Sequence, residues 1–181
     1  CRTNSICKIG RRRCSVNMGK KVEKEKFKTF AVEIVDMLNR SIERLIYSYN
    51  KVTNFISKHT NFNDEELETI ESMCSRFARL NDILLQKVLR FLDIYEFNGY
   101  DFPVPKRISL AKKRKIIDDE MEFKYIRELR NEVVHNYATD YYIELFKEIY
   151  KYTPKLLEYS KRAKRYIEEN LLKLFPATRT F

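Results

Sequence analysis

The scarcity of glycine and proline constrains this chain more than any other feature of its sequence. Its 181 residues contain only three glycines and four prolines. These two residue types supply the breaks and tight turns on which strand-and-turn folds depend. Apolar residues instead recur every three or four positions over long stretches, which is the period of an amphipathic helix. The sequence therefore predicts an all-α fold built from long helices.

We expect four main helices and one short helix, arranged as an up-and-down helical bundle. Asn63, with Glu66 three residues later, is typical of a helix start. Pro154 lies inside the last predicted helix and should kink it, because proline removes a backbone donor. A loop over 97–105, which contains two prolines, separates the second helix from the short one. The predicted helices span residues 21–58, 64–96, 109–117, 119–137 and 141–174.

A single domain accounts for most of the chain. We expect this domain to span residues 18–175, followed by a tail at 176–181. Residues 1–17 hold five basic residues and no acidic one, and they contain three of the four cysteines. Met18 with Gly19 looks like a natural initiation site, so we interpret residues 1–17 as a leader that is disordered or derived from upstream sequence.

The net charge of the chain has two interpretations. The net charge is +10, of which residues 1–17 supply five, so the rest carries about +5. Such a bias is compatible with a polyanion such as RNA, although a solvated surface of lysines and glutamates explains it equally well. No run of about 18 apolar residues occurs, so we expect no membrane span.

The segment 127–137 is the candidate working site, and its core is Arg130-Asn131-Glu132-Val133-Val134-His135-Asn136-Tyr137. A guanidinium can place two donors on a phosphate, and a neutral imidazole can accept a proton near pH 7. Together they suffice to cleave RNA without a metal, through attack by the ribose 2′-hydroxyl. On a helix, His135 is rotated by about 140° from Arg130, and a second copy of the helix would close this gap. The alternative is a surface arginine, a satisfied histidine and a core tyrosine.

Two further groups of side chains are candidates for RNA contact. The first is a basic run together with one arginine of the motif helix: Lys112, Lys113, Arg114, Lys115 and Arg127. A solvated helix face explains the basic run equally well. The tyrosines of the last helix can stack on bases, but tyrosines at helical spacing are more often core or interface residues.

The sequence predicts no metal site. Glu132 and His135 have the Glu-x-x-His spacing of di-iron bundles, but that site needs a second pair. The only other histidine, His59, has Ile56 at the required position. The cysteines (Cys1, Cys7, Cys14 and Cys74) match no zinc spacing. We therefore expect neither a metal nor another cofactor.

Residues 130–137 resemble the Arg-x4-His-x-Tyr signature of HEPN domains, in particular the HepT-like toxins that are paired with MNT nucleotidyltransferase antitoxins. The predicted order of helices is similar over about residues 18–175. The resemblance implies a homodimer that forms through the motif helix and acts as a metal-independent endoribonuclease toxin. Arg130 and His135 would be catalytic, and Asn131 would be their polar neighbour. Tyr137 would be the residue that the nucleotidyltransferase adenylylates, and the protein would be cytoplasmic.

The resemblance leaves other functions open. Many HEPN domains bind nucleotides or partners without cleaving anything, so the leading alternative is a non-catalytic nucleotide- or partner-binding module. A third possibility is a structural helical adaptor, in which Arg130 and His135 would be exposed and unpaired.

Overall fold

The computed structural model describes residues 7–57, 61–135 and 139–173, with side chains for 25–57, 61–133 and 142–173. All regular structure in these ranges is helical, which confirms the all-α fold. The elements are α1 (Cys7–Thr53), α2 (Asp64–Asp82), a π-helical segment (Ile83–Leu89), α3 (Arg90–Glu96), α4 (Val104–Lys113), α5 (Glu120–His135), α6 (Thr139–Ile167) and a second π-helical segment (Glu168–Leu172).

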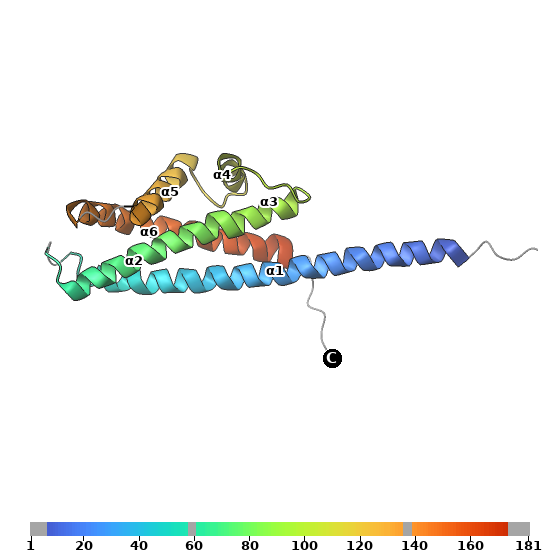
Figure 1. Ribbon diagram of the computed structural model, residues 1–181, viewed down its shortest axis with the longest axis horizontal. Helices are drawn as coiled ribbons and strands as arrows, with labels where there is room; N and C mark the ends of the chain where they lie inside the picture. Colours follow the sequence, from blue (N-terminus) through green and yellow to red (C-terminus); the bar gives the residue numbers. More distant parts are fainter. Residues whose placement is uncertain (1–6, 58–60, 136–138, 174–181) are drawn as a thin grey trace, which may run out of the picture.

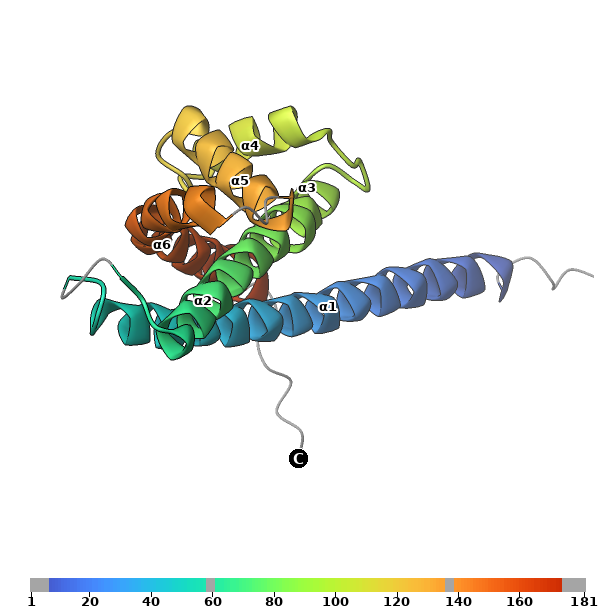
Figure 2. The same ribbon diagram turned by 60° about the vertical axis from the view of Figure 1, so that its left-hand side comes forward.

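The helices form a bundle around α2. Helix α2 continues through the first π-helical segment into α3, so residues 64–96 form one rod that is antiparallel to α1 (Figure 1). Helix α6 packs against both α1 and α2, and α4 and α5 lie on the side of α2 away from α1 (Figures 1 and 2). The first part of α1 extends beyond the bundle in both views. The bundle of four main helices and one short helix is thus confirmed.

The core lies where α1, α2, α5 and α6 meet. Phe77 of α2, Phe123 of α5 and Phe146 of α6 have no exposed surface. These rings occupy the apolar stripes that the helical period predicts. Truncation of one such ring to alanine typically costs about 3–5 kcal/mol, so these contacts fix how α5 sits on α2 and α6.

Two predicted helix starts are present. The Asn63 Oδ1 atom accepts a hydrogen bond from the Glu66 backbone N–H at 2.9 Å, and the Glu66 carboxylate accepts one from the Asn63 N–H at 3.1 Å. At the start of α5, the Asp119 carboxylate accepts a hydrogen bond from the Glu122 N–H at 3.1 Å. Each cap satisfies backbone donors that the first turn leaves free.

The short helix differs from its predicted bounds. Helix α4 begins at Val104 and ends at Lys113, whereas the sequence predicted residues 109–117. Pro103 precedes its first residue, and Pro105 lies in its first turn. Proline is tolerated in a first turn because the missing N–H has no intrahelical partner there. The two prolines that predicted a loop therefore begin a helix.

The outer helices also differ in length from their predictions. Helix α1 begins at Cys7 rather than near residue 21, and the interpretation of residues 1–17 as a leader stays a prediction. Helix α6 runs through Pro154, and the kink expected there stays a prediction as well.

Candidate functional site

Arg130 of α5 is held against α2 by a carboxylate. Its Nη2 atom donates to Oδ2 of Asp82 at 2.6 Å, and its Nη1 atom donates to Oδ1 of Asn131 at 3.2 Å. Arg130 and Asp82 are 48 positions apart in the sequence, so the contact depends on the packing of α5 on α2. The guanidinium is thereby oriented rather than free to sample solvent.

Orientation, rather than stability, is what this ion pair contributes. The Arg130 side chain is 27% exposed and the Asp82 side chain is 42% exposed. Ion pairs with this much access to water contribute only about 0–1 kcal/mol, because solvent screens the charges. The same access leaves Arg130 reachable by a ligand. Asp82 carried no signal in the sequence, since one aspartate near the middle of a long helix is unremarkable.

Unpaired polar atoms lie on and beside this pair. The Nε atom of Arg130 and both side-chain polar atoms of Asn81 are buried without a hydrogen-bond partner among the described residues. A buried polar atom without a partner typically costs about 1–3 kcal/mol, so such atoms call for an explanation. The π-helical segment begins at Ile83, directly after Asp82. π-Helical turns occur frequently at functional sites.

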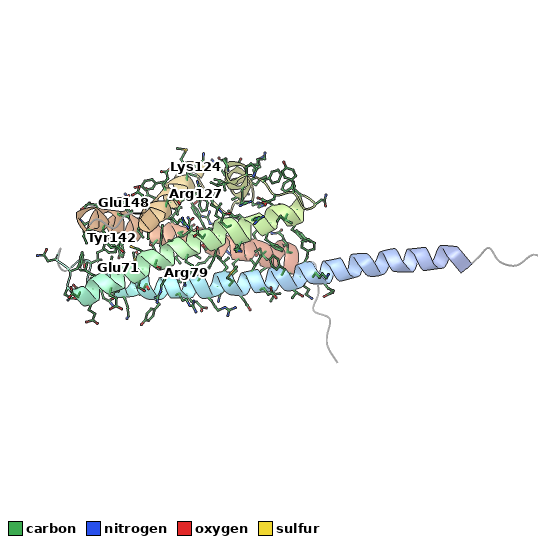
Figure 3. All side chains as sticks on the ribbon, in the orientation of Figure 1. Glu71, Arg79, Lys124, Arg127, Tyr142 and Glu148 are labelled. Carbon is green, nitrogen blue, oxygen red and sulfur yellow. The ribbon has the colours of Figure 1, made fainter. Side chains whose placement is uncertain are left out.

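The flank of α5 that holds Arg130 carries further cations. Arg127 lies one turn before Arg130, and Lys124 lies one turn before Arg127 (Figure 3). Both side chains are partly exposed. Neither forms an ion pair or side-chain hydrogen bond with another described residue. The flank therefore presents a cationic stripe that ends near Arg130.

His135 is the last residue of α5. The helix backbone places its Cα about 7.5 Å along the axis from that of Arg130 and about 140° around it. The His135 side chain, Tyr137 and His59 lie outside the described side chains. The convergence of Arg130 with His135, and the role of Tyr137, therefore stay predictions.

The basic run at the end of α4 divides into free and engaged side chains. Lys112 and Lys113 are exposed. The Arg114 side chain is only 5% exposed and donates to Asp93 and Glu96, each at 2.8 Å. Arg114 therefore makes its contacts within the protein, which the spacing of charges in the sequence did not indicate. Lys115 follows the helix in a left-handed conformation, with φ of 59°.

Asp93 is the centre of a buried network that sequence reasoning missed. It has no exposed surface, and it accepts hydrogen bonds from Arg107 at 3.2 Å and from Arg114 at 2.8 Å. Arg107 also donates to Asp101 at 2.7 Å and to the Phe102 carbonyl at 2.9 Å. Since both arginines come from α4 or its end, the network ties α4 to α3.

The tyrosines of α6 pack mainly within the protein. Tyr150 stacks on Tyr49 with ring centroids 4.8 Å apart, and Tyr159 has no exposed surface. Tyr152 packs edge-on against Tyr125. These contacts favour the core interpretation of these three tyrosines over base stacking.

Among the residues described, no group of three or more His, Cys, Asp or Glu side chains is placed to hold a metal ion. The thiol of Cys74 is buried, and burial raises its pKa to about 12, so it is a poor source of thiolate at neutral pH. A search of the described helices also finds none with the length and apolarity that crossing a bilayer requires.

Comparison of the chain with protein-family models, with curated proteins and with solved structures finds no match.

Proposed function

We propose that the protein is a metal-independent endoribonuclease that uses Arg130 and His135, and that it acts as the toxin of a HEPN/MNT toxin–antitoxin pair. The observation that carries this proposal is the oriented but reachable guanidinium of Arg130. It lies at the end of the stripe formed with Lys124 and Arg127, and it shares its helix with His135.

The reaction follows from these two groups. The imidazole of His135 accepts the proton of a ribose 2′-hydroxyl, and the 2′-oxygen attacks the adjacent phosphorus. The bond from phosphorus to the 5′-oxygen breaks, which leaves a 2′,3′-cyclic phosphate, and the departing oxygen is protonated by water. Arg130 stabilises the charge that builds on the phosphoryl oxygens. Lys124 and Arg127 hold neighbouring phosphates of the strand.

Pairing with an antitoxin would act on a residue that follows this helix in the sequence. A nucleotidyltransferase would transfer AMP from ATP to the phenol oxygen of Tyr137 and release pyrophosphate. Tyr137 follows Arg130 by seven positions and the last residue of α5 by two, so the added phosphate would be attached close to Arg130 in the sequence. It would neutralise Arg130 and compete with RNA.

The test is RNA cleavage in the presence of excess EDTA. We expect products with 2′,3′-cyclic phosphate ends from the unaltered chain and none from the His135→Ala variant. The matched control is His59→Ala, since the chain has only two histidines. Cleavage that EDTA alone abolishes, or equal loss in both variants, would refute the mechanism.

A second experiment tests the shared site. In a homodimer joined through α5, a mixture of Arg130→Ala and His135→Ala chains can form one intact site from the Arg130 of one copy and the His135 of the other. We expect the mixture to regain part of the cleavage that each variant lacks. If mixing restores nothing, both residues act within one chain or no such dimer forms.

The alternative function is a non-catalytic module that binds a nucleotide or a partner protein. It is favoured by one observation, namely that Asp82 and Asn131 already occupy the two terminal nitrogens of Arg130. A guanidinium in such contacts can be a structural support rather than a reactive group. Retention of intact RNA or nucleotide, with no cyclic phosphate ends, would identify this alternative.

A further inference from the structure

A second cationic region lies apart from Arg130. It is an open hollow of about 270 Å³ between the turn after α4 and the final turns of α6. None of its lining residues belongs to α5, the helix that holds Arg130. Its lining consists of Arg114, Lys115, Arg162, Arg165, Tyr166 and Glu169.

Two of the lining arginines are held in place from behind. Arg114 donates to Asp93 and Glu96, each at 2.8 Å. Arg162 donates to Asp118 at 2.5 Å and also to Glu158. These carboxylates offset the charge of both guanidinium groups and fix their position, so the two arginines form a rigid polar wall.

The excess charge of the hollow comes from two other side chains. Lys115 and Arg165 are exposed, and neither side chain forms an ion pair or hydrogen bond with another described residue. Glu169 is the one carboxylate among the six lining residues. Two uncompensated cations therefore face one carboxylate, which leaves the hollow with a positive balance that favours an anion.

The backbone at Lys115 has a conformation that is unfavourable for a lysine. The N–H of Ile116 donates to the Ala111 carbonyl at 3.0 Å, which closes α4 with a Schellman-type end. Lys115 occupies the left-handed position of that end, where glycine is usual because it has no Cβ to strain. A lysine at this position raises the free energy of the backbone and places an ammonium group beside the hollow.

We propose that this hollow binds a phosphate group, with Lys115 and Arg165 as its donors. The phosphate comes either from an RNA backbone or from a free nucleotide or phosphate ion. The site does not depend on cleavage at Arg130, so it can be tested in a chain that cleaves nothing.

Binding is measured with the full chain and three probes: a fluorescent single-stranded RNA, AMP and inorganic phosphate. We expect Arg165→Ala and Lys115→Gly each to weaken RNA binding by about five- to tenfold at low salt. Each should also reduce the slope of log K against log salt by about 0.7, the value for one phosphate contact on a single strand. Glu169→Gln should instead tighten binding, because it removes the opposing carboxylate.

Two controls distinguish a loss of binding at the hollow from a loss of folded protein and from a general loss of positive charge. Lys115→Gly should keep or raise the melting temperature, since glycine suits the left-handed conformation. Lys106→Ala removes an exposed cation of α4 from outside the hollow and should leave the affinity nearly unchanged. Competition by AMP or inorganic phosphate identifies a free phosphate as the ligand, and its absence identifies the RNA backbone. Unchanged binding in Arg165→Ala and Lys115→Gly, or an equal loss in Lys106→Ala, would overturn the proposal.

Discussion

Two arginine–aspartate contacts in this protein look alike in chemistry and differ in setting. In the network of Asp93 with Arg107, the side chains are 0% and 4% exposed, and nearly every donor has an acceptor. In the pair of Asp82 with Arg130, they are 42% and 27% exposed, and the Nε atom of Arg130 has no hydrogen-bond partner among the described residues. The first arrangement suits a structural joint. The second suits a site at which a ligand can compete.

The largest effect is expected from Arg107→Ala. Removal of Arg107 takes away one of the two arginines that bind the buried Asp93 carboxylate and leaves Arg114 as the other. We therefore expect a cost of about 3 kcal/mol, near the low end for breaking a buried ion pair. For a chain of this size we expect the melting temperature to fall by about 10 °C. The control is Arg40→Ala, which removes an exposed arginine of α1. A loss below about 1 kcal/mol, measured by urea unfolding, would place this network among ordinary surface pairs.

A smaller effect of opposite sign is expected from Asn81→Leu. The Asn81 carboxamide is fully buried without a partner among the described residues, so an apolar side chain of similar size should raise the free energy of unfolding by about 1–2 kcal/mol. Chemical denaturation measures this change. If Asn81→Leu instead lowers the stability, an internal water satisfies the carboxamide in solution.

Asp82→Ala should separate stability from function. Because the pair is half-exposed, the free energy of unfolding should change by no more than about 1 kcal/mol. If the proposed function holds, the rate of RNA cleavage should fall about tenfold, since Arg130 loses the acceptor that orients it. Asp36→Ala, at an exposed position of α1, is the matched control. A large fall in the free energy of unfolding would instead show that Asp82 mainly stabilises the fold.

The smallest effect concerns a third, exposed cluster. Arg162 and Lys155 hold the pKa of the Asp118 carboxyl below its ordinary value through direct hydrogen bonds. The folded protein therefore binds fewer protons at Asp118 than the unfolded chain does. This contribution to stability is complete above the ordinary pKa of aspartate and is lost as the pH falls through the lowered value. In Asp118→Asn, the free energy of unfolding should therefore fall slightly less as the pH is lowered. Chemical denaturation at several pH values measures this dependence. An identical pH dependence in the variant and in the unaltered chain would show that Asp118 does not contribute to it.

Most of the fold could be predicted from the helical period and the capping residues. Asn63 and Asp119 cap the helices that their spacing predicted, and the rod over 64–96 has its predicted bounds. The period does not reveal the π-helical turns at Ile83–Leu89, because a single widened turn leaves the apolar stripe nearly intact. The early start of α4 was missed because proline is compatible with both a loop and a first turn.

The site was less predictable than the fold, because its contacts join distant parts of the chain. The sequence singled out Arg130 through its spacing from His135, but it gave no sign of Asp82, which lies 48 positions away. Likewise, Lys112 and Arg114 were equivalent members of one basic run. Only packing distinguishes the exposed lysine from the arginine bound to Asp93.

The decisive measurement is the rate at which Arg130→Ala forms 2′,3′-cyclic phosphate ends in EDTA, together with the melting temperature of this variant. We expect at least a roughly hundredfold loss of rate, which is the size expected when a group that stabilises transition-state charge is removed. The melting temperature should stay within about 4 °C of that of the unaltered chain, since the pair contributes at most about 1 kcal/mol. An unchanged rate, or a loss of rate that simply follows unfolding, would contradict a catalytic role for Arg130.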